Sequence, residues 1–399
     1  MLKNAAAGGS AVIVALAIAT PAFAETRTSM VVAGDGSVES NPYAVSTGSS
    51  ATASVGAQVD PKIAIVTATS TLALHGTARV QQYTSRYGTE VSGGAAADYV
   101  QHLSDHTTLN AAVGYHTSLS GVRDQLSLRI DPTDTTTPPD LVLIDPSLIG
   151  QRLRNQSLNA SAGLSFMTSA RDTLSLSSGY NQSWVKGTAG NDFRFITGQA
   201  NFSHVLSAHS SVNASVSYGS SHYFNTASGD STTISPQVGI STVLGARMML
   251  LLQGGATFVR INQGNGTKRN VTAFSGQVNL CRHGEYDDFC LAASRAAQPT
   301  LFGGMRNLTR LSFDYSRKLS ERNRLSLQAD YSRGDGSYLP SSTSLASLVG
   351  GSASFSRQFN RRFSGFVTAG AQKAYDTNTQ RPVNAFGRIG LRYLFGDDR

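Results

Sequence analysis

The stretch that decides the fold is Gly387-Arg388-Ile389-Gly390-Leu391-Arg392-Tyr393-Leu394-Phe395, close to the end of the chain. Apolar Ile389 and Leu391 alternate in it with Arg388 and Arg392. A period of two places successive side chains on opposite faces of a β-strand. The stretch therefore predicts a strand with one apolar face and one charged face.

The apolar face of this strand closes on the aromatic pair Tyr393 and Phe395. An apolar outer face, a polar inner face and aromatic residues at the membrane interface are typical of outer-membrane β-barrels. We therefore predict that residues 384–395 form the C-terminal strand of such a barrel. We expect Tyr393 and Phe395 to act as the membrane-insertion signal read by the barrel assembly machinery.

The first 24 residues have the pattern of a secretory signal peptide. Lys3 precedes the apolar run 11–19, and Ala22-Phe23-Ala24 is a small-x-small cleavage site. The alternative, a membrane-anchoring helix, needs about 20 apolar residues. We expect residues 1–24 to be removed and residues 25–399 to form a barrel in the bacterial outer membrane.

The composition suits a barrel wall between lipid and water. Hydrophobic residues make up 40% of the chain and charged residues only 15%, against about 25% in a typical soluble domain. The formal net charge of +8 would suggest nucleic acid for a cytoplasmic protein. Export argues against nucleic acid, and it leaves an anion-attracting lumen or contacts with lipopolysaccharide phosphates.

Alternating segments separated by turn residues recur along the chain, and we count about 18 strands, with 16 as the alternative. We predict an all-β, antiparallel, up-and-down transmembrane barrel whose even strand number leaves both termini periplasmic. Asp60-Pro61-Lys62 is one of the predicted short turns. Residues 120–154 form the longest predicted extracellular loop, which is a candidate plug.

Charged residues fall on one face of several predicted strands. A charge facing lipid at mid-bilayer would cost about 2–4 kcal/mol, so we expect these residues to face the lumen. Their role is either wall stiffening by salt bridges or the conduction of anions. The pore-lining candidates are Arg310, Arg324, Asp314, Asp330, Arg388 and Arg392.

Cys281 and Cys290 flank a short segment that suits a hairpin. In an oxidising compartment we expect a disulfide between them. A metal site formed with His283 and Asp287 is the alternative, but the spacing of strong metal motifs is absent. The strand count places this hairpin on the periplasmic side, and the sequence predicts no cofactor.

Enzyme signatures are absent from the sequence: it has no Gly-x-Ser-x-Gly, His-Glu-x-x-His or phosphate-binding glycine motif. We interpret Gly34-Asp35-Gly36 as turn material. The chain is predicted not to be an enzyme, and no catalytic set is nominated. An outer-membrane lipid hydrolase is the enzymatic alternative.

Several segments together resemble the β-barrel porin 2 family and related barrels encoded with exopolysaccharide systems. They are residues 39–43, residues 72–83, Ser118-Leu119, residues 294–304 and Tyr315-Ser316-Arg317. The resemblance extends over residues 28–395. It implies a barrel for export of a polymer or passage of small solutes, with a polysaccharide and periplasmic export proteins as partners.

These observations predict a porin-like channel for anionic solutes or for an exopolysaccharide. The alternative is a structural or docking barrel closed by the 120–154 loop. The expected partners are outer-membrane lipid and lipopolysaccharide, and nucleic acid is not among them.

Overall fold

A computed structural model describes residues 24–45, 51–119, 152–186, 192–224, 229–262, 267–300, 304–335, 347–375 and 381–396. No helix that could cross a membrane occurs within these ranges. The strands of the described part are β1 Glu25–Glu39, β2 Thr52–Val66, β3 Ser70–Tyr83, β4 Thr89–Ser104, β5 Thr107–Leu119, β6 Arg154–Met167, β7 Asp172–Lys186, β8 Phe193–Ser207, β9 Ser210–Tyr223, β10 Ser231–Leu244, β11 Met248–Asn262, β12 Lys268–His283, β13 Asp287–Pro299, β14 Met305–Lys318, β15 Asn323–Asp335, β16 Ser347–Gln358, β17 Phe363–Tyr375 and β18 Asn384–Gly396.

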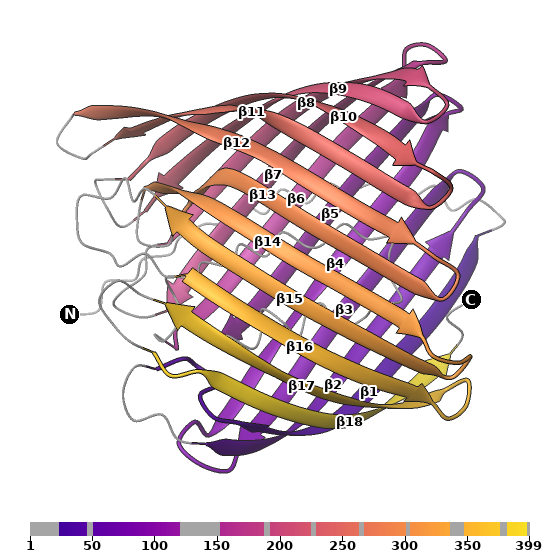
Figure 1. The fold of residues 1–399 in the computed structure, drawn as a ribbon, viewed down its shortest axis with the longest axis vertical. Coiled ribbons are helices and arrows are strands. Elements are labelled where there is room, and N and C mark those ends of the chain that lie inside the picture. Colours follow the sequence, from indigo (N-terminus) through magenta and orange to yellow (C-terminus); the bar gives the residue numbers. More distant parts are fainter. Residues whose placement is uncertain are drawn as a thin grey trace, which may run out of the picture.

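These strands form one 18-stranded sheet in which each pairs antiparallel with its neighbours in the chain. β1 also pairs with β18, from Ser29 opposite Gly396 to Glu39 opposite Phe386. That pairing closes the sheet into a barrel with tilted strands (Figure 1). The predicted all-β antiparallel barrel is confirmed, with 18 strands rather than 16.

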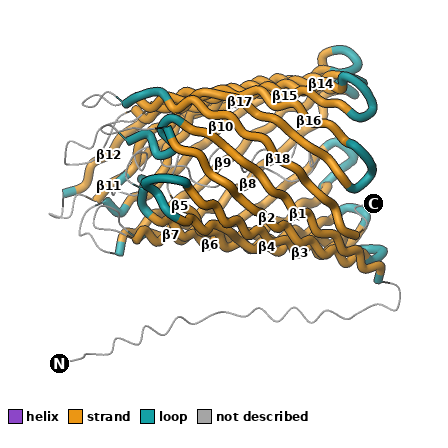
Figure 2. The backbone as a smooth tube through the Cα atoms, turned by 90° about the horizontal axis from the view of Figure 1, so that it is seen from below, coloured by secondary structure: helices purple, strands orange, loops and turns teal. Residues whose placement is uncertain are grey.

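The two ends of the barrel differ in their connections, as the tube view also shows (Figure 2). One end carries turns of two to four residues, and β1 begins and β18 ends there. The strand bounds leave five to 34 residues for each connection at the other end. We call these the short-turn end and the long-connection end. Short periplasmic turns and longer extracellular loops are the usual arrangement in bacterial barrels.

The predicted turn at Asp60-Pro61-Lys62 is wrong, because these residues lie inside β2. The turn follows β2 instead, where the amide of Thr67 donates to the carbonyl of Ser70 at 2.8 Å. Proline lacks a backbone donor and normally breaks a central strand. Here the ladder between β2 and β3 is interrupted at the proline: the paired residues run to Val59 opposite Ala78 and resume at Lys62 opposite His75. The missing donor of Pro61 falls in this gap.

Two sequence predictions lie outside the described residues. The signal peptide falls on residues 1–23 and Ala24, of which only Ala24 is described. The long loop 120–154 is described only from Arg152 onward.

The last strand ends at a glycine that the geometry requires. Gly396 has a φ of +82°, which only glycine adopts without strain. A Cβ there would lie 2.2 Å from the carbonyl oxygen of Thr28 on the neighbouring strand β1. The residue after the aromatic pair is therefore part of the closing seam.

We expect Gly396→Val to impair barrel closure, because the conformational strain alone is worth about 1–3 kcal/mol and the side chain clashes with β1. The measurement is the fraction of heat-modifiable, folded protein after refolding into detergent. Gly387→Val is the matched control, since nothing lies within 4 Å of a Cβ at Gly387. Equal folding yields for the two variants would contradict the role of Gly396.

Candidate functional site: the polar lumen

In most strands the more polar face points into the barrel. On β18, Ile389 is 63% exposed and Leu391 is 50% exposed, and Arg388 lies on the opposite face. The hydroxyl of Tyr223 on β9 lies 2.8 Å and 2.9 Å from the carbonyl oxygens of Thr300 and Gly304, beyond β13. Because β10 to β12 separate these elements along the wall, this contact crosses the interior. Tyr223 shares its face with the serine and asparagine side chains of β9, so that face is the lumen.

The structure places all six predicted pore-lining residues on the inner face. The four on β14 and β15 lie on the face of the sheet opposite to that of Leu311 and Phe313, whose exposed fractions of 42% and 37% mark the outer face. They form two groups rather than one ladder, because β16 and β17 separate β15 from β18. Arg310, Asp314, Asp330 and Arg324 make up the first group, and Arg388 and Arg392 the second.

A buried charged cluster of the lumen centres on Asp35 of β1, whose side chain is 1% exposed. Arg388 of β18 donates two hydrogen bonds to its carboxylate, of 2.9 Å and 2.8 Å. Arg79 of β3 donates a third of 2.9 Å, and its second terminal nitrogen also lies 2.9 Å from the carboxylate. Two guanidinium groups thus hold one carboxylate. Charge-assisted, bidentate contacts of this kind are the strong ones in proteins.

A glycine lets this cluster form across a strand. Asp35 lies opposite Gly56 of β2, and Arg79 lies on the far side of β2. A Cβ at Gly56 would lie 2.7 Å from a terminal nitrogen of Arg79 and 3.2 Å from the Asp35 carboxylate. The Arg79 side chain therefore reaches β1 only over a residue without a side chain.

Asp35 is not among the site residues predicted from the sequence, which assigns it to a turn. Gly34-Asp35-Gly36 was expected to be turn material, but it lies within β1. Glycines on both sides mimic a turn signal, whereas here they lie on the outer face beside a strand residue that needs a partner. The alternation over residues 28–40 is itself the pattern of a strand, and it is the signal that places Asp35 inside one.

Arg388 and Arg392 also share a contact on the inner face. Their guanidinium carbons lie 5.3 Å and 4.8 Å from the ring centre of Phe366 on β17. Phe366 is 6% exposed. Cation–π contacts hold both arginines against the wall without neutralising their charge.

Opposite this charged wall lies an uncharged one. The inner faces of β6 to β11 carry no charged side chain within the described residues. Those of β6 to β10 are rich in hydroxyl and amide groups, and β11 adds Gln253 and Thr257 among apolar residues. Gln253 of β11, for example, donates to Ser215 of β9 at 2.8 Å, passing Gly239 of β10. Examples of these side chains are Asn159, Ser161, Ser177, Asn181, Gln199, Asn213, Ser215, Gln237 and Gln253.

The segment after β1 narrows the mouth at the long-connection end. Tyr43 is 1% exposed, and its hydroxyl donates to Glu90 of β4 at 2.5 Å. Its ring lies 4.7 Å from that of Tyr87, and the guanidinium of Arg152 lies over both rings. Burial, together with the nearby Tyr83 and Glu90, raises the pKa of Tyr43 far above its usual value, so the hydroxyl stays protonated.

The same segment is fastened to the other side of the closing seam. The backbone amide of Asn41 donates to the side chain of Asn384 on β18 at 2.8 Å. Arg381 donates to the carbonyl of Ala44 at 3.0 Å. Residues 40–45, which we call the strap, therefore connect β18 with β4 on the inner side of β1 to β3.

Cys281 and Cys290 lie directly opposite each other on β12 and β13, with Cα atoms 4.1 Å apart and sulfur atoms at disulfide distance. Both face the lumen at the short-turn end, because Cys290 also lies opposite the inward-facing Asp314. Within the described ranges, no group of three His, Cys, Asp or Glu residues could hold a metal ion.

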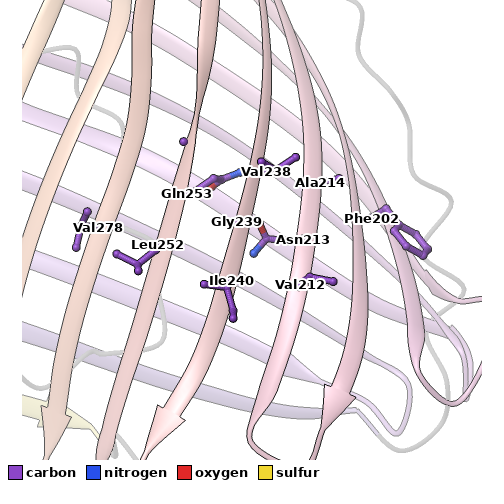
Figure 3. Close-up of a pocket in the computed structure, with 11 residues that line it drawn as sticks. Phe202, Val212, Asn213, Ala214, Val238, Gly239, Ile240, Leu252, Gln253 and Val278 are labelled. Carbon is purple, nitrogen blue, oxygen red and sulfur yellow. The ribbon is translucent and has the colours of Figure 1, made fainter.

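A shallow hollow on the wall is not part of the lumen. It is lined by apolar side chains of β8 to β12 that share the exposed outer face, among them Phe202, Val238, Leu252 and Val278 (Figure 3). An apolar hollow facing outward suits acyl chains of lipid rather than a solute.

The sequence matches no family model and no curated protein. Solved barrels are similar in shape. OccK2 of Pseudomonas aeruginosa in complex with glucuronate has a TM-score of 0.47 and 10% identity, covering 93% of this chain and 98% of its own. OpdL of the same organism has a TM-score of 0.46 and 10% identity, and the match covers 93% of this chain and 99% of OpdL. OccAB3 of Acinetobacter baumannii has a TM-score of 0.46 and 10% identity, and the match covers 94% of this chain and 100% of OccAB3.

We expect Asp35→Asn to lower the free energy of unfolding by about 3 kcal/mol, because it leaves two largely buried arginines without their shared carboxylate. The measurement is urea unfolding of the refolded protein in detergent micelles. Glu25→Gln is the control, since the Glu25–Arg27 pair is exposed to solvent and should contribute little. An unfolding midpoint that shifts equally in both variants would refute the importance of the cluster.

Proposed function

We propose that this chain is a channel in the bacterial outer membrane with both termini in the periplasm. The support is the division of the wall into an exposed apolar outer face and a polar inner face around a closed ring of strands. Lipid on one side and water on the other require this division. We infer a transport role without catalysis, and insertion guided by Tyr393 and Phe395, which are both exposed on the outer face.

The solute we propose is anionic. The observation that carries this proposal is the set of inner-face cations at the short-turn end. Lys318 and Arg324 lie directly opposite each other on β14 and β15, and neither they nor Arg392 has a carboxylate partner within the described residues. A low-dielectric wall focuses the field of such charges into the lumen and favours anions there.

Acidic saccharides, including an exported acidic exopolysaccharide, fit the two-sided lumen best. The hydroxyl and amide wall of β6 to β11 lies half-way round the ring from β15 to β18 and β1. A bound acidic sugar could direct its carboxylate to the arginines and its hydroxyl groups to the opposite wall. We propose membership of the exopolysaccharide-associated porin family on the same grounds.

One observation favours a second function, a closed docking barrel in an envelope export system. The strap and the contact of Tyr223 with Thr300 both occupy the mouth at the long-connection end. Such a barrel would open only with a partner or after movement of a plug.

Replacing Arg324 and Arg392 by Glu should weaken or reverse the preference for anions. These two arginines are the better targets, because Arg388 is committed to Asp35 and its loss also disturbs the fold. The measurement is the reversal potential in a planar bilayer under a salt gradient. Arg357→Glu is the matched control, since Arg357 shares the outer face of β16 with the 40% exposed Phe355.

Unchanged selectivity in the Arg324/Arg392 variant would argue against anion selection by this group. A selectivity change of the same size in Arg357→Glu would show that the effect comes from overall charge rather than from the lumen.

Deletion of residues 125–150 separates the two functions. A closed docking barrel should gain conductance when a plug is removed, whereas an open channel should change little. Single-channel recording of wild type and deletion variant, each shown to be folded by heat-modifiable migration, gives the answer. A silent deletion variant would contradict both the channel and the plugged barrel.

A further inference from the structure

Three cations that have no carboxylate partner among the described residues lie on the outer face of the barrel at the long-connection end. They are Arg154 at the start of β6, Lys186 at the end of β7 and Arg194 near the start of β8. We propose that they bind the phosphate groups of an anionic glycolipid in the outer leaflet. The proposal rests on the outer-membrane location argued above, but not on conduction or its selectivity.

Strand register places all three on the lipid side. Lys186 lies on the same face of β7 as Leu176, which is 43% exposed. Arg194 lies on the same face of β8 as Ile196, which is 45% exposed. Arg154 lies directly opposite Lys186. The three residues therefore sit above the apolar belt on adjacent strands, where lipid headgroups would begin.

Within the described residues none of the three cations forms an ion pair, although the carboxylate of Asp192, which accepts from the amide of Val185 at 3.0 Å, lies beside Lys186. Arg154 donates to the carbonyl of Val91 at 3.1 Å and to the hydroxyl of Thr117 at 3.3 Å. Neither group carries charge, and no carboxylate partners Arg154, Lys186 or Arg194 within the described residues. Like charges directly opposite across two strands are destabilising, so an anion between Arg154 and Lys186 would relieve their repulsion.

The neighbouring surface marks a lipid boundary. Trp184, the only tryptophan of the chain, precedes Lys186 by two residues on the same face and lies opposite Gln156. The guanidinium of Arg194 lies 5.9 Å from the ring centre of Phe224, which is 47% exposed. Aromatic side chains of this kind gather at the level of lipid headgroups.

These features favour a lipid over a soluble anion. The patch lies on the outer wall rather than in the lumen, and apolar side chains continue directly below it. A phosphorylated glycolipid would place its phosphates on the cations and its acyl chains on that apolar surface. Nearby His222 is already engaged by Asp230 at 2.7 Å, so the three cations carry the site.

Trp184 gives a direct readout of binding. The full barrel in neutral detergent is titrated with diphosphoryl lipid A in mixed micelles, and Trp184 emission is recorded. We expect a saturable change that dephosphorylated lipid A does not produce. The Arg154→Gln/Lys186→Gln variant should bind more weakly by about fivefold for each charge removed. Lipid phosphorus retained per barrel after detergent washing is a second measurement that does not depend on Trp184.

Lys373→Gln is the matched control, because Lys373 is an outer-face cation near the same end of β17, with its amino group 4.7 Å from the ring centre of Tyr375. It should leave binding unchanged. Equal binding of the dephosphorylated lipid, equal weakening by Lys373→Gln, or full competition by inorganic phosphate at matched concentration would overturn the proposed site. The anion conductance of these variants in bilayers without phosphorylated glycolipid should be unaffected. A negative result for lipid binding would therefore leave the channel proposal standing.

Discussion

The structure depends on closure of the sheet between its first and last strands. The backbone ladder between β1 and β18 leaves no free sheet edge, and open edges cannot be tolerated in lipid. Asp35 reinforces this seam from inside, because its buried carboxylate is held by Arg388 of the last strand and by Arg79 of the third. A buried carboxylate needs such partners, so the pairing of these side chains favours one register at the seam.

The wall is one residue thick, and this constraint organises every other feature. Each side chain faces either lipid or lumen, so a long side chain can reach a distant strand only along the inner surface. Two such crossings pass over glycines: Arg79 passes Gly56, and Gln253 passes Gly239. These crossings tie strands that share no backbone hydrogen bonds, and they distinguish a charged sector of the lumen from one built of hydroxyl and amide groups.

The two ends of the barrel perform different physical tasks. At the short-turn end the inner face presents cations that have no carboxylate partner in the part of the chain that the structure describes, which suits the capture of anions. At the long-connection end the strap turns inward with Tyr43 fully buried, while Arg154 and Lys186 turn outward beside Trp184. Charged side chains therefore lie on the inner face at one end, whereas at the other end the strap lies inside and cations lie outside.

The sequence by itself determined the strand type and the two faces, because a period of two is a local property and the cost of charge in lipid fixes which face is outside. It left the strand number between 16 and 18, and the closed ring decided for 18. It placed Arg310, Arg324, Arg388 and Arg392 on the correct face. It misread Asp60-Pro61-Lys62 and Gly34-Asp35-Gly36 as turns, because proline and glycine carry the same local signal in a turn and in a strand. Only the tertiary structure decided that Pro61 falls in a gap of the ladder between β2 and β3 and that Asp35 meets two arginines. Both facts depend on how the closed ring brings the strands together.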